Sequence, residues 1–311
     1  MKKQQAEFVE RTQCINCGST HLTELSNGRF GDEPLRTFIE KSPWGDSPLP
    51  YIENEQWVYV RCHDCTQMFH KRVLSPVWNE KRFSEWMTEA AIRQFEKEAS
   101  VNTPPHIFNR AKQHVLHVLR LEKMTRELCD NEAVRVLDFG CGWGDFLAMC
   151  DHFGFTACGI DRSSSRRSGG MQNVQIFPEI EYLKTAPEAA HGFHVVTLFE
   201  VLEHLDTPLA VLQLLRDFLV PNGILVLETP DCTNVTDVIT EIEYLKIHPL
   251  DHINGFTPYT LRTIAARAGF RLVRPDIAHA TCDSMSVVKN EVKRLIGGLL
   301  KPRTQQYFRK V

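Results

Sequence analysis

The stretch Val134-Arg135-Val136-Leu137-Asp138-Phe139-Gly140-Cys141-Gly142-Trp143-Gly144 decides the fold of this 311-residue chain. Apolar and β-branched residues lead to an acidic residue and then to three glycines at alternate positions, which predicts a buried strand that ends in a tight turn. Glycine allows positive φ and lets the backbone approach a ligand without an intervening Cβ. A helix expected at residues 145–153 points its N-terminus at the same place. The stretch therefore predicts a nucleotide or adenosine site.

The glycine spacing distinguishes two kinds of nucleotide site. The dinucleotide fingerprint G-x-G-x-x-G requires glycine at position 145, where this chain has Asp145. The G-x-G-x-G form therefore belongs to a different ligand. A second strand, expected at residues 155–160, ends in Asp161, where a carboxylate can accept hydrogen bonds from both ribose hydroxyls.

Strands and helices are expected to alternate after this turn. Strands are expected at residues 174–177, 194–200 and 224–228, and a helix at 209–219 ends at the turn signal Pro221-Asn222-Gly223. This order predicts an α/β, doubly wound, Rossmann-like sheet, with ligands at the carboxyl ends of its strands.

Two C-x-x-C pairs near the N-terminus form a candidate metal site. They are Cys14-Ile15-Asn16-Cys17 and Cys62-His63-Asp64-Cys65, and a strand-like run leads into the second pair. Four thiolates in two such pairs can hold one structural Zn²⁺ tetrahedrally, as in a zinc ribbon. The interval of 44 residues between the pairs is long for a ribbon, so free cysteines in a loop-rich N-terminus are the alternative. Neither pair begins a helix in a βαβ pattern, which disfavours thioredoxin-type redox chemistry.

Composition limits the partners and the compartment. With 36 basic and 39 acidic residues the formal net charge is -3, which gives no overall attraction to nucleic acid or to an anionic membrane. The N-terminus lacks the apolar stretch of a signal peptide, and no run approaches the roughly 18 apolar residues of a membrane span. A cytoplasmic protein with reduced cysteines is therefore expected.

Two helical regions are expected between the cysteine pairs and the glycine turn. Residues 76–100 carry Trp78, Phe83, Trp86 and Phe95, which fit either a helix packed on the main domain or a lid over the substrate. A second helix, at 107–129, contains His114 and His117. No third metal ligand is evident nearby, so partly buried histidines are the better interpretation.

Several motifs, in order, resemble those of class I S-adenosylmethionine-dependent methyltransferases. Within that class they are similar to the branch that includes ubiquinone-type O-methyltransferases and deoxysugar methyltransferases, and some sugar enzymes of that branch carry an N-terminal zinc-binding unit. Asn222 stands where the family usually has glycine, and the loop after Asp161 is unusually rich in Ser, Arg and Gly. The motifs are Asp138-x-Gly140-x-Gly142-x-Gly144, Asp161 at a strand end, Phe199-Glu200-Val201-Leu202-Glu203-His204-Leu205 and Leu219-Val220-Pro221-Asn222-Gly223-Ile224-Leu225.

The resemblance implies a seven-stranded methyltransferase sheet, finished by an antiparallel hairpin from strands at 270–275 and 284–288, and it implies roles for several residues. Gly140 and Gly142 would let the backbone close on the methionine part of S-adenosylmethionine, Asp161 would bind the ribose, and Glu200 would face the transferred methyl group. Side chains at the positions of Glu203 and His204 often support the turn rather than react. The implied cofactor-binding residues are Asp138, Gly140, Cys141, Gly142, Trp143, Gly144, Asp161 and Glu200.

The segment from His248 to Thr257 resembles a family block in which a histidine precedes an aromatic residue and a helix-capping Ser or Thr. His252 matches that histidine, and a neutral imidazole is well suited to removing a proton at physiological pH. The alternative is that His252 only ties the loop to its neighbours. His248 is the second catalytic candidate, and Thr257 is the expected N-cap of a helix at 258–268.

The sequence as a whole predicts a methyltransferase that acts on an O or C nucleophile of a small molecule, with a sugar or nucleotide-linked sugar as the favoured acceptor. The alternatives are an RNA methyltransferase that grips RNA with the zinc ribbon, and a non-catalytic S-adenosylmethionine-binding protein. Nucleic acid is disfavoured as a partner. The basic C-terminal tail fits a solvated helix better than a membrane or acidic-partner contact. The expected divisions are 1–75 (zinc-ribbon-like), 76–132 (helical linker), 133–290 (methyltransferase) and 291–311 (tail).

Overall fold

The computed structural model describes residues 4–98, 103–130, 132–168, 174–236, 239–275 and 303–311, together with positions 285, 287–289 and 292. The chain divides into two compact units. The first consists of residues 1–102, 202–208 and 230–260, and the second of residues 103–201, 209–229 and 261–311. This division differs from the four segments expected above, whose boundaries stay predictions. Among the helices that the structure describes, none is long and apolar enough to cross a bilayer.

The second unit contains the predicted sheet. Its seven strands have the order β12-β13-β10-β9-β6-β7-β8; neighbours from β10 to β8 are parallel, and β13 is antiparallel to both β10 and β12. The α/β fold class is thus confirmed. The strands are β6 (Arg135–Phe139), β7 (Thr156–Ile160), β8 (Gln175–Phe177), β9 (Phe193–Phe199), β10 (Leu219–Glu228), β12 (Phe270–Val273) and β13 (Gln306–Lys310).

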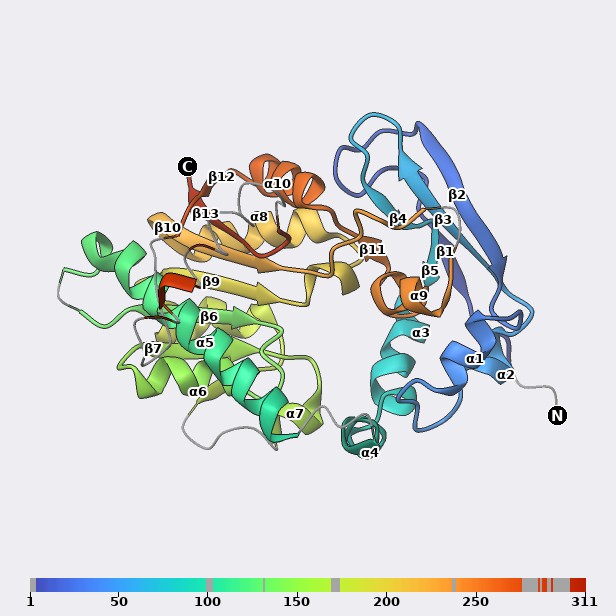
Figure 1. Ribbon diagram of the computed structural model, residues 1–311, viewed down its shortest axis with the longest axis horizontal. Helices are drawn as coiled ribbons and strands as arrows, with labels where there is room; N and C mark the ends of the chain where they lie inside the picture. The colour runs from blue at the N-terminus through green and yellow to red at the C-terminus, as the bar shows by residue number, and fades with distance from the viewer. Residues whose placement is uncertain are drawn as a thin grey trace. The chain divides into compact units, whose positions relative to one another are not determined.

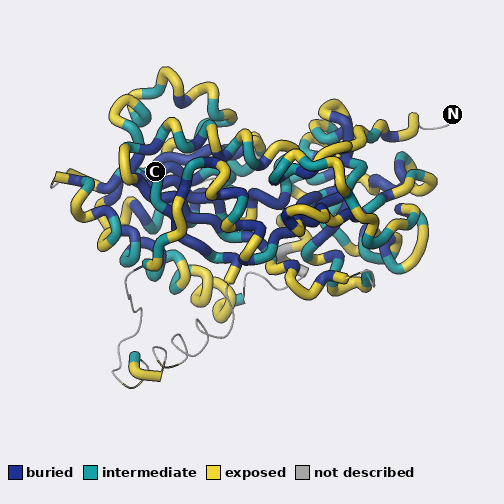
Figure 2. The backbone as a smooth tube through the Cα atoms, turned by 90° about the horizontal axis from the view of Figure 1, so that it is seen from above, coloured by how far each residue is buried: buried dark blue, intermediate teal, exposed yellow. Residues whose placement is uncertain are grey.

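Helices cover both faces of this sheet. Six consecutive residues of the central strand β9 are buried, as expected for a strand covered on both faces, and Figure 2 shows the strands as the dark, buried interior. Helices α5 and α6 lie on one side of the strands, and α8 and α10 on the other (Figure 1). The helices are α5 (Pro104–Thr125), α6 (Asp145–His152), α7 (Ser164–Ser168), α8 (Pro208–Phe218) and α10 (Pro258–Arg267), with short 3₁₀ turns at η2 (Arg126–Leu128), η3 (Ile180–Thr185) and η4 (Pro187–Ala189).

Two details of the sheet differ from the prediction. The strand that pairs with β12 is β13, at the end of the chain; of the predicted partner at 284–288 the structure describes positions 285, 287 and 288, and these are helical, so the prediction of a strand there is wrong. The last residues of the basic tail therefore belong to the sheet, and residues 293–302 lie outside the description. Pro221-Asn222-Gly223 also does not interrupt the strand, because β10 runs from Leu219 to Glu228 with a register shift before Ile224 that accommodates Asn222 at φ 60°.

The first unit is built on two small antiparallel sheets, with the orders β11-β4-β3-β2 and β1-β5. Helix α9 packs beside them and begins with a capping box formed by Thr240 and Glu243. The strands are β1 (Phe8–Glu10), β2 (Leu22–Arg29), β3 (Gln56–Cys62), β4 (Met68–His70), β5 (Arg72–Leu74) and β11 (Asn254–Gly255). The helical elements are α1 (Leu35–Glu40), α2 (Leu49–Ile52), α3 (Pro76–Lys81), α4 (Glu89–Glu98), α9 (Glu241–Ile247) and the turn η5 (Leu202–His204).

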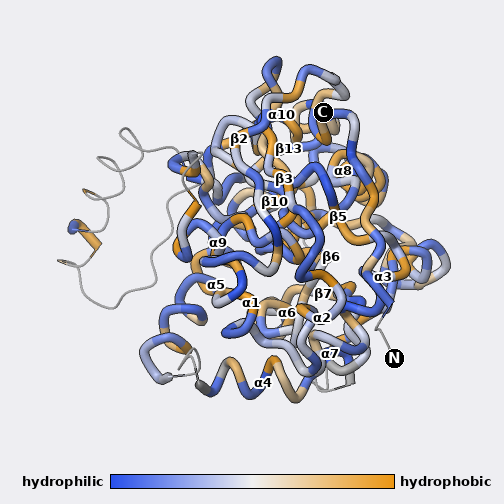
Figure 3. Tube along the Cα trace, turned by 90° about the vertical axis from the view of Figure 1, so that its right-hand side faces the viewer, coloured by the Kyte–Doolittle hydropathy of each residue, from blue (hydrophilic) through white to orange (hydrophobic). Residues whose placement is uncertain are grey.

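The aromatic region at 76–100 is three elements rather than one helix. Helix α3 continues into a π-helical turn, η1 (Arg82–Trp86), and α4 follows. Trp78 and Trp86 are buried in the core of the first unit, whereas Phe95 is exposed on α4, where hydrophobic and hydrophilic residues alternate (Figure 3). The tryptophans therefore belong to the core of the first unit, whereas the sequence placed this region either on the main domain or over the substrate.

Candidate functional site

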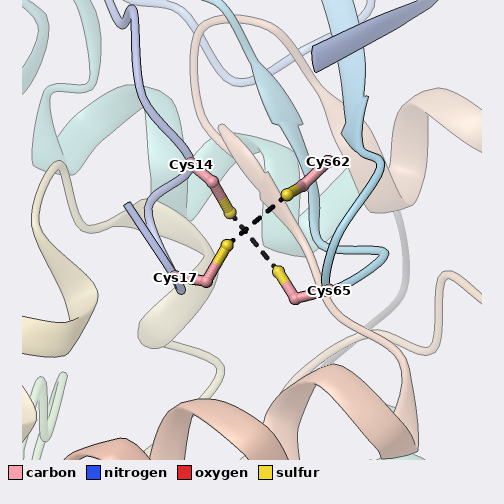
Figure 4. A group of neighbouring side chains, drawn as sticks. All are labelled: Cys14, Cys17, Cys62 and Cys65. Carbon is pink, nitrogen blue, oxygen red and sulfur yellow. Dashed lines mark hydrogen bonds between the residues drawn. The ribbon is translucent and has the colours of Figure 1, made fainter. Parts of the chain in front are cut away.

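The four cysteines of the C-x-x-C pairs meet in the first unit. Their sulfur atoms lie within 4.8 Å of one another, with Cys14 Sγ 3.5 Å from Cys65 Sγ and Cys17 Sγ 3.5 Å from Cys62 Sγ. Figure 4 shows all four sulfurs pointing at a common centre. A tetrahedral zinc with Zn–S bonds of about 2.3 Å places its sulfurs roughly 3.8 Å apart, so the donor set and its spacing fit Zn²⁺.

Local contacts favour thiolate character at Cys14, whereas burial raises the pKa of the Cys17 thiol. The hydrogen bond from Cys65 lowers the pKa of the Cys14 thiol to about 5, and the backbone N–H of Asn16 also donates to Cys14 Sγ (3.4 Å). Cys62 is the last residue of β3, and Cys65 lies in the turn that leads to β4, so the sheet holds the second pair in place. All four ligand positions belong to cysteines, which leaves no open position for catalysis.

The glycine turn of the second unit has the geometry that the sequence predicted. Gly140, Gly142 and Gly144 all have positive φ (79°, 57° and 85°). A Cβ at Gly140 would lie only 2.3 Å from Val201 Cγ2, so glycine is needed there for packing. A Cβ at Gly142 would meet no atom within 4 Å. The space beside Gly142 is therefore free for a ligand, and α6 begins directly after the turn.

Asp161 is joined to this turn by a hydrogen bond. Its buried carboxylate accepts the backbone N–H of Gly142 at Oδ2 (2.9 Å) and that of Ser163 at Oδ1 (2.9 Å). The guanidinium of Arg166 lies 3.8 Å from Oδ2. Each carboxylate oxygen has two lone pairs, so a ribose hydroxyl can still bind beside each backbone donor. The structure thus brings the two ends of the predicted adenosine site together.

The remaining predicted cofactor residues occupy different surroundings. Asp138 is buried in the sheet, where Thr197 Oγ1 donates to its Oδ1 (2.6 Å), and burial raises the pKa of Asp138 to about 7. Burial also raises the pKa of the Cys141 thiol, which excludes a nucleophilic thiolate there. Trp143 is partly buried in the turn. Glu200 has an exposed side chain, a φ of 54° and a backbone N–H that donates to Glu228 O (2.9 Å).

The catalytic candidate His252 lies in the first unit, in a group with Glu203 and His204 whose donor atoms are within 4.8 Å of one another. His204 Nδ1 contacts Asp251 Oδ1 (3.0 Å), and although burial lowers the pKa of His204, Asp251 raises it to about 9. Burial lowers the pKa of His252 to about 4, so its imidazole is neutral at physiological pH. Among the described residues, His252 Nδ1 has no hydrogen-bond partner.

His248 is the less accessible of the two candidates. It is buried, its Nδ1 accepts the backbone N–H of Leu250 (3.1 Å), and its ring packs edge-on against Phe38 and Trp44. Burial lowers the pKa of His248 to about 3. These contacts favour a packing role, and a catalytic role for either histidine stays a prediction.

Sequence reasoning did not identify Asp251 and Arg82 as part of this group. Arg82 is fully buried, and its Nη1 lies 2.6 Å from Asp251 Oδ1. Together with His204 and seven neighbours they line a pocket in the first unit. Asp251 directly precedes His252, which was a usable signal, but nothing in the sequence connects position 82 with position 251.

Comparison with known proteins decides the family. Residues 81–274 match a family model described as a methyltransferase domain. The chain belongs to this family. It is similar to the ubiquinone biosynthesis O-methyltransferase of Haemophilus ducreyi, with 31% identity over 207 residues that cover 63% of this chain and 81% of the relative. The mitochondrial enzyme of that name from Schizosaccharomyces pombe is 27% identical over 190 residues, covering 54% of this chain and 69% of the relative.

A solved structure, a SAM-dependent methyltransferase from Archaeoglobus fulgidus, covers 67% of this chain and all of its own, with 22% identity and a TM-score of 0.42. That overlap adds nothing to the family match. The chain is an S-adenosylmethionine-dependent methyltransferase, and the predicted family resemblance is confirmed. The cysteine cluster lies before the matched residues.

Proposed function

We propose that this methyltransferase transfers a methyl group from S-adenosylmethionine to an oxygen or carbon nucleophile of a small molecule. The observation that carries the proposal is the Gly140–Gly144 turn joined to Asp161, with free space at Gly142. The bound cofactor supplies an electrophilic methyl on a sulfonium. The backbone of the turn holds the methionine part and Asp161 holds the ribose, so the protein contributes mainly by positioning the reactants.

Calorimetry tests this cofactor assignment. S-adenosylmethionine is expected to bind the wild-type protein, whereas NAD is expected not to bind, because Asp145 replaces the third glycine of a dinucleotide turn. Binding of NAD with comparable affinity would contradict the assignment.

For the acceptor, we infer that His252 removes the proton of the attacking group. A neutral ring with an unpaired Nδ1 is the protonation state that a general base requires. The low pKa weakens His252 as a base, and the same group also has the composition of a divalent-cation site. Asp251 contacts Nδ1 of His204 and so orients its ring. Nε2 of His204 then faces Glu203, with 3.9 Å between His204 Nε2 and Glu203 Oε1.

A divalent ion bound there would orient and acidify an acceptor hydroxyl. The two roles separate experimentally. If His252 is a base alone, turnover of the zinc-loaded protein does not depend on added Mg²⁺, and if the group binds a cation, turnover rises with added Mg²⁺.

We further propose that the cysteine cluster holds one structural zinc, as its donor set and sulfur spacing support. The acceptor class stays a proposal. The relatives are named for ubiquinone biosynthesis, which makes a hydroxylated ring compound as reasonable a candidate as the predicted sugar. Mass spectrometry of ligands that co-purify with the protein would distinguish the two, and RNA methylation would appear as transfer to added RNA.

A further inference from the structure

A polar cluster in the second unit lies at the carboxyl end of β10, and the proposed function assigns it no role. It comprises Glu228, His117, Gln305 and Tyr307, and we name it the Glu228 cluster. Glu228 is the last residue of β10, His117 belongs to α5, Gln305 directly precedes β13 and Tyr307 belongs to it. Three segments far apart in the sequence thus place polar groups at one strand end.

Short contacts connect the members of the cluster. Gln305 Nε2 donates to Glu228 Oε2 (2.7 Å) and lies 3.2 Å from His117 Nε2, which is itself 3.6 Å from Glu228 Oε2. On the other side of the ring, His117 Nδ1 is 2.7 Å from Tyr307 Oη. Both ring nitrogens of His117 are therefore engaged within the cluster, and the ring is fixed between Glu228 and Tyr307.

The packing around His117 makes this arrangement rigid. The His117 side chain is only 3% exposed, and its ring contacts Phe199 with 4.7 Å between ring centroids. Arg120, one turn further along α5, donates to Tyr307 Oη (3.4 Å). A buried polar network whose members all have partners is rigid and fixes the position of each group in it. The group at its open end is the Glu228 carboxylate.

Glu228 is the one member that reaches solvent while remaining charged. Its side chain is 35% exposed. Burial raises the pKa of Glu228, but His117 and Gln305 outweigh burial and bring the pKa below its ordinary value. A fixed negative charge therefore faces the carboxyl edge of the sheet.

Strand register places this charge relative to the glycine turn. Glu228 pairs with Phe199 at the end of β9, and Thr197 pairs with Asp138 on β6, so Phe199 is level with Gly140. Glu228, Phe199 and Gly140 thus lie at one level on three adjacent strands about 4.8 Å apart. Asp161 lies on the other side, after β7. A cofactor whose ribose sits at Asp161 extends its methionine part across the turn towards β9 and β10.

We propose that Glu228, positioned by His117 and Gln305, is the counter-charge for the cationic methionine part of the cofactor. This inference rests on the cofactor placement proposed above. The methionine part offers two positive groups: the sulfonium, which only S-adenosylmethionine has, and the α-ammonium, which S-adenosylhomocysteine shares. Methylthioadenosine has neither group but keeps the ribose and the adenine.

Calorimetry with these three ligands on the full-length protein tests the proposal. Glu228→Gln should lower the affinity for S-adenosylmethionine about three- to tenfold, as expected for opposite charges roughly 7 Å apart at an intermediate dielectric, and should leave methylthioadenosine binding unchanged. If Glu228→Gln also weakens the binding of S-adenosylhomocysteine, the α-ammonium is the partner of Glu228. If the affinity for S-adenosylhomocysteine stays unchanged while that for S-adenosylmethionine falls, the sulfonium is the partner.

The matched control is Glu132→Gln. Glu132 lies three residues before β6, at the amino end of that strand, and pairs with Arg135. This substitution should change no affinity. Gln305→Met should reproduce the pattern of Glu228→Gln at about two- to threefold, because the carboxylate loses the donor that positions it.

Two results would overturn the proposal. If Glu228→Gln left the affinity for S-adenosylmethionine unchanged, Glu228 would not be the counter-charge. If the variant lost affinity for methylthioadenosine to the same extent, the effect of the substitution would be structural only. Failure of the underlying cofactor placement would look different, because Asp161→Ala would then leave methylthioadenosine binding intact.

Discussion

The glycine turn of the second unit and the histidine group of the first unit are built in opposite ways. The turn and its Asp161 partner come from one continuous stretch, with donor and acceptor only 19 positions apart. The histidine group needs residues from three separate segments, and Arg82 lies 169 positions from Asp251. A site built from local sequence can be recognised by its motif, whereas a site assembled by tertiary folding becomes visible only when the segments meet.

The cysteine cluster, also assembled from distant segments, should show the largest effect. Cys62→Ser removes one of four thiolates, and structural zinc contributes on the order of 10 kcal/mol to folding in small zinc domains. We expect about one zinc per wild-type chain, none or a fraction in the variant, and rapid proteolysis of the first unit. Cys129→Ser, in the second unit, is the control and should keep the metal. A zinc-free wild type that resists proteolysis would exclude a structural zinc.

His252→Ala should have the next largest effect. Loss of a general base lowers turnover about 10²- to 10⁴-fold, while S-adenosylmethionine affinity should stay within about threefold. Turnover is followed as release of S-adenosylhomocysteine with the acceptor identified by mass spectrometry. The exposed residue His191, replaced by Ala, serves as the control. Unchanged turnover in His252→Ala would show that His252 only stabilises the loop and does not act as a base.

Asp161→Ala tests the local site. Charge-assisted hydrogen bonds contribute about 1.5 to 3 kcal/mol each, so removing the carboxylate should weaken S-adenosylmethionine binding roughly 10- to 100-fold. Asp151→Ala, an exposed carboxylate on α6, should leave the affinity unchanged. Equal affinities for wild type and Asp161→Ala in calorimetry would contradict the ribose assignment.

The smallest effect concerns Asp138 and pH. Burial raises the pKa of the Asp138 carboxyl in the folded protein from 3.8 to about 7. The contribution of Asp138 to the free energy of unfolding is therefore fully present below about pH 4 and is lost as the pH rises through 7. Chemical denaturation should show roughly 1 kcal/mol less stability at pH 8.5 than at pH 6 from this residue. Asp138→Asn should remove that difference. An identical pH dependence in the variant would show that Asp138 is charged in the folded protein at both pH values.

The same contrast explains what could be predicted from the sequence. Strands β6 to β9, the cap Thr257 and the turn glycines follow from local pattern, and the structure has them, with Thr257 Oγ1 accepting the N–H of Thr260 (3.2 Å). Strand β13 could not be placed, because its pairing with β10 and β12 joins positions far apart in the chain. The π-helical turn at Arg82 and the Glu228 cluster were missed for the same reason.

Gly142 offers the most direct test of the central claim that this turn binds S-adenosylmethionine. Since a Cβ at Gly142 would meet no protein atom within 4 Å, Gly142→Ala should leave the fold intact apart from about 1 kcal/mol of backbone strain at φ 57°. The added methyl group would enter the space assigned to the cofactor. Calorimetry should therefore show loss of S-adenosylmethionine binding by a folded Gly142→Ala protein, and wild-type affinity in that variant would contradict the account.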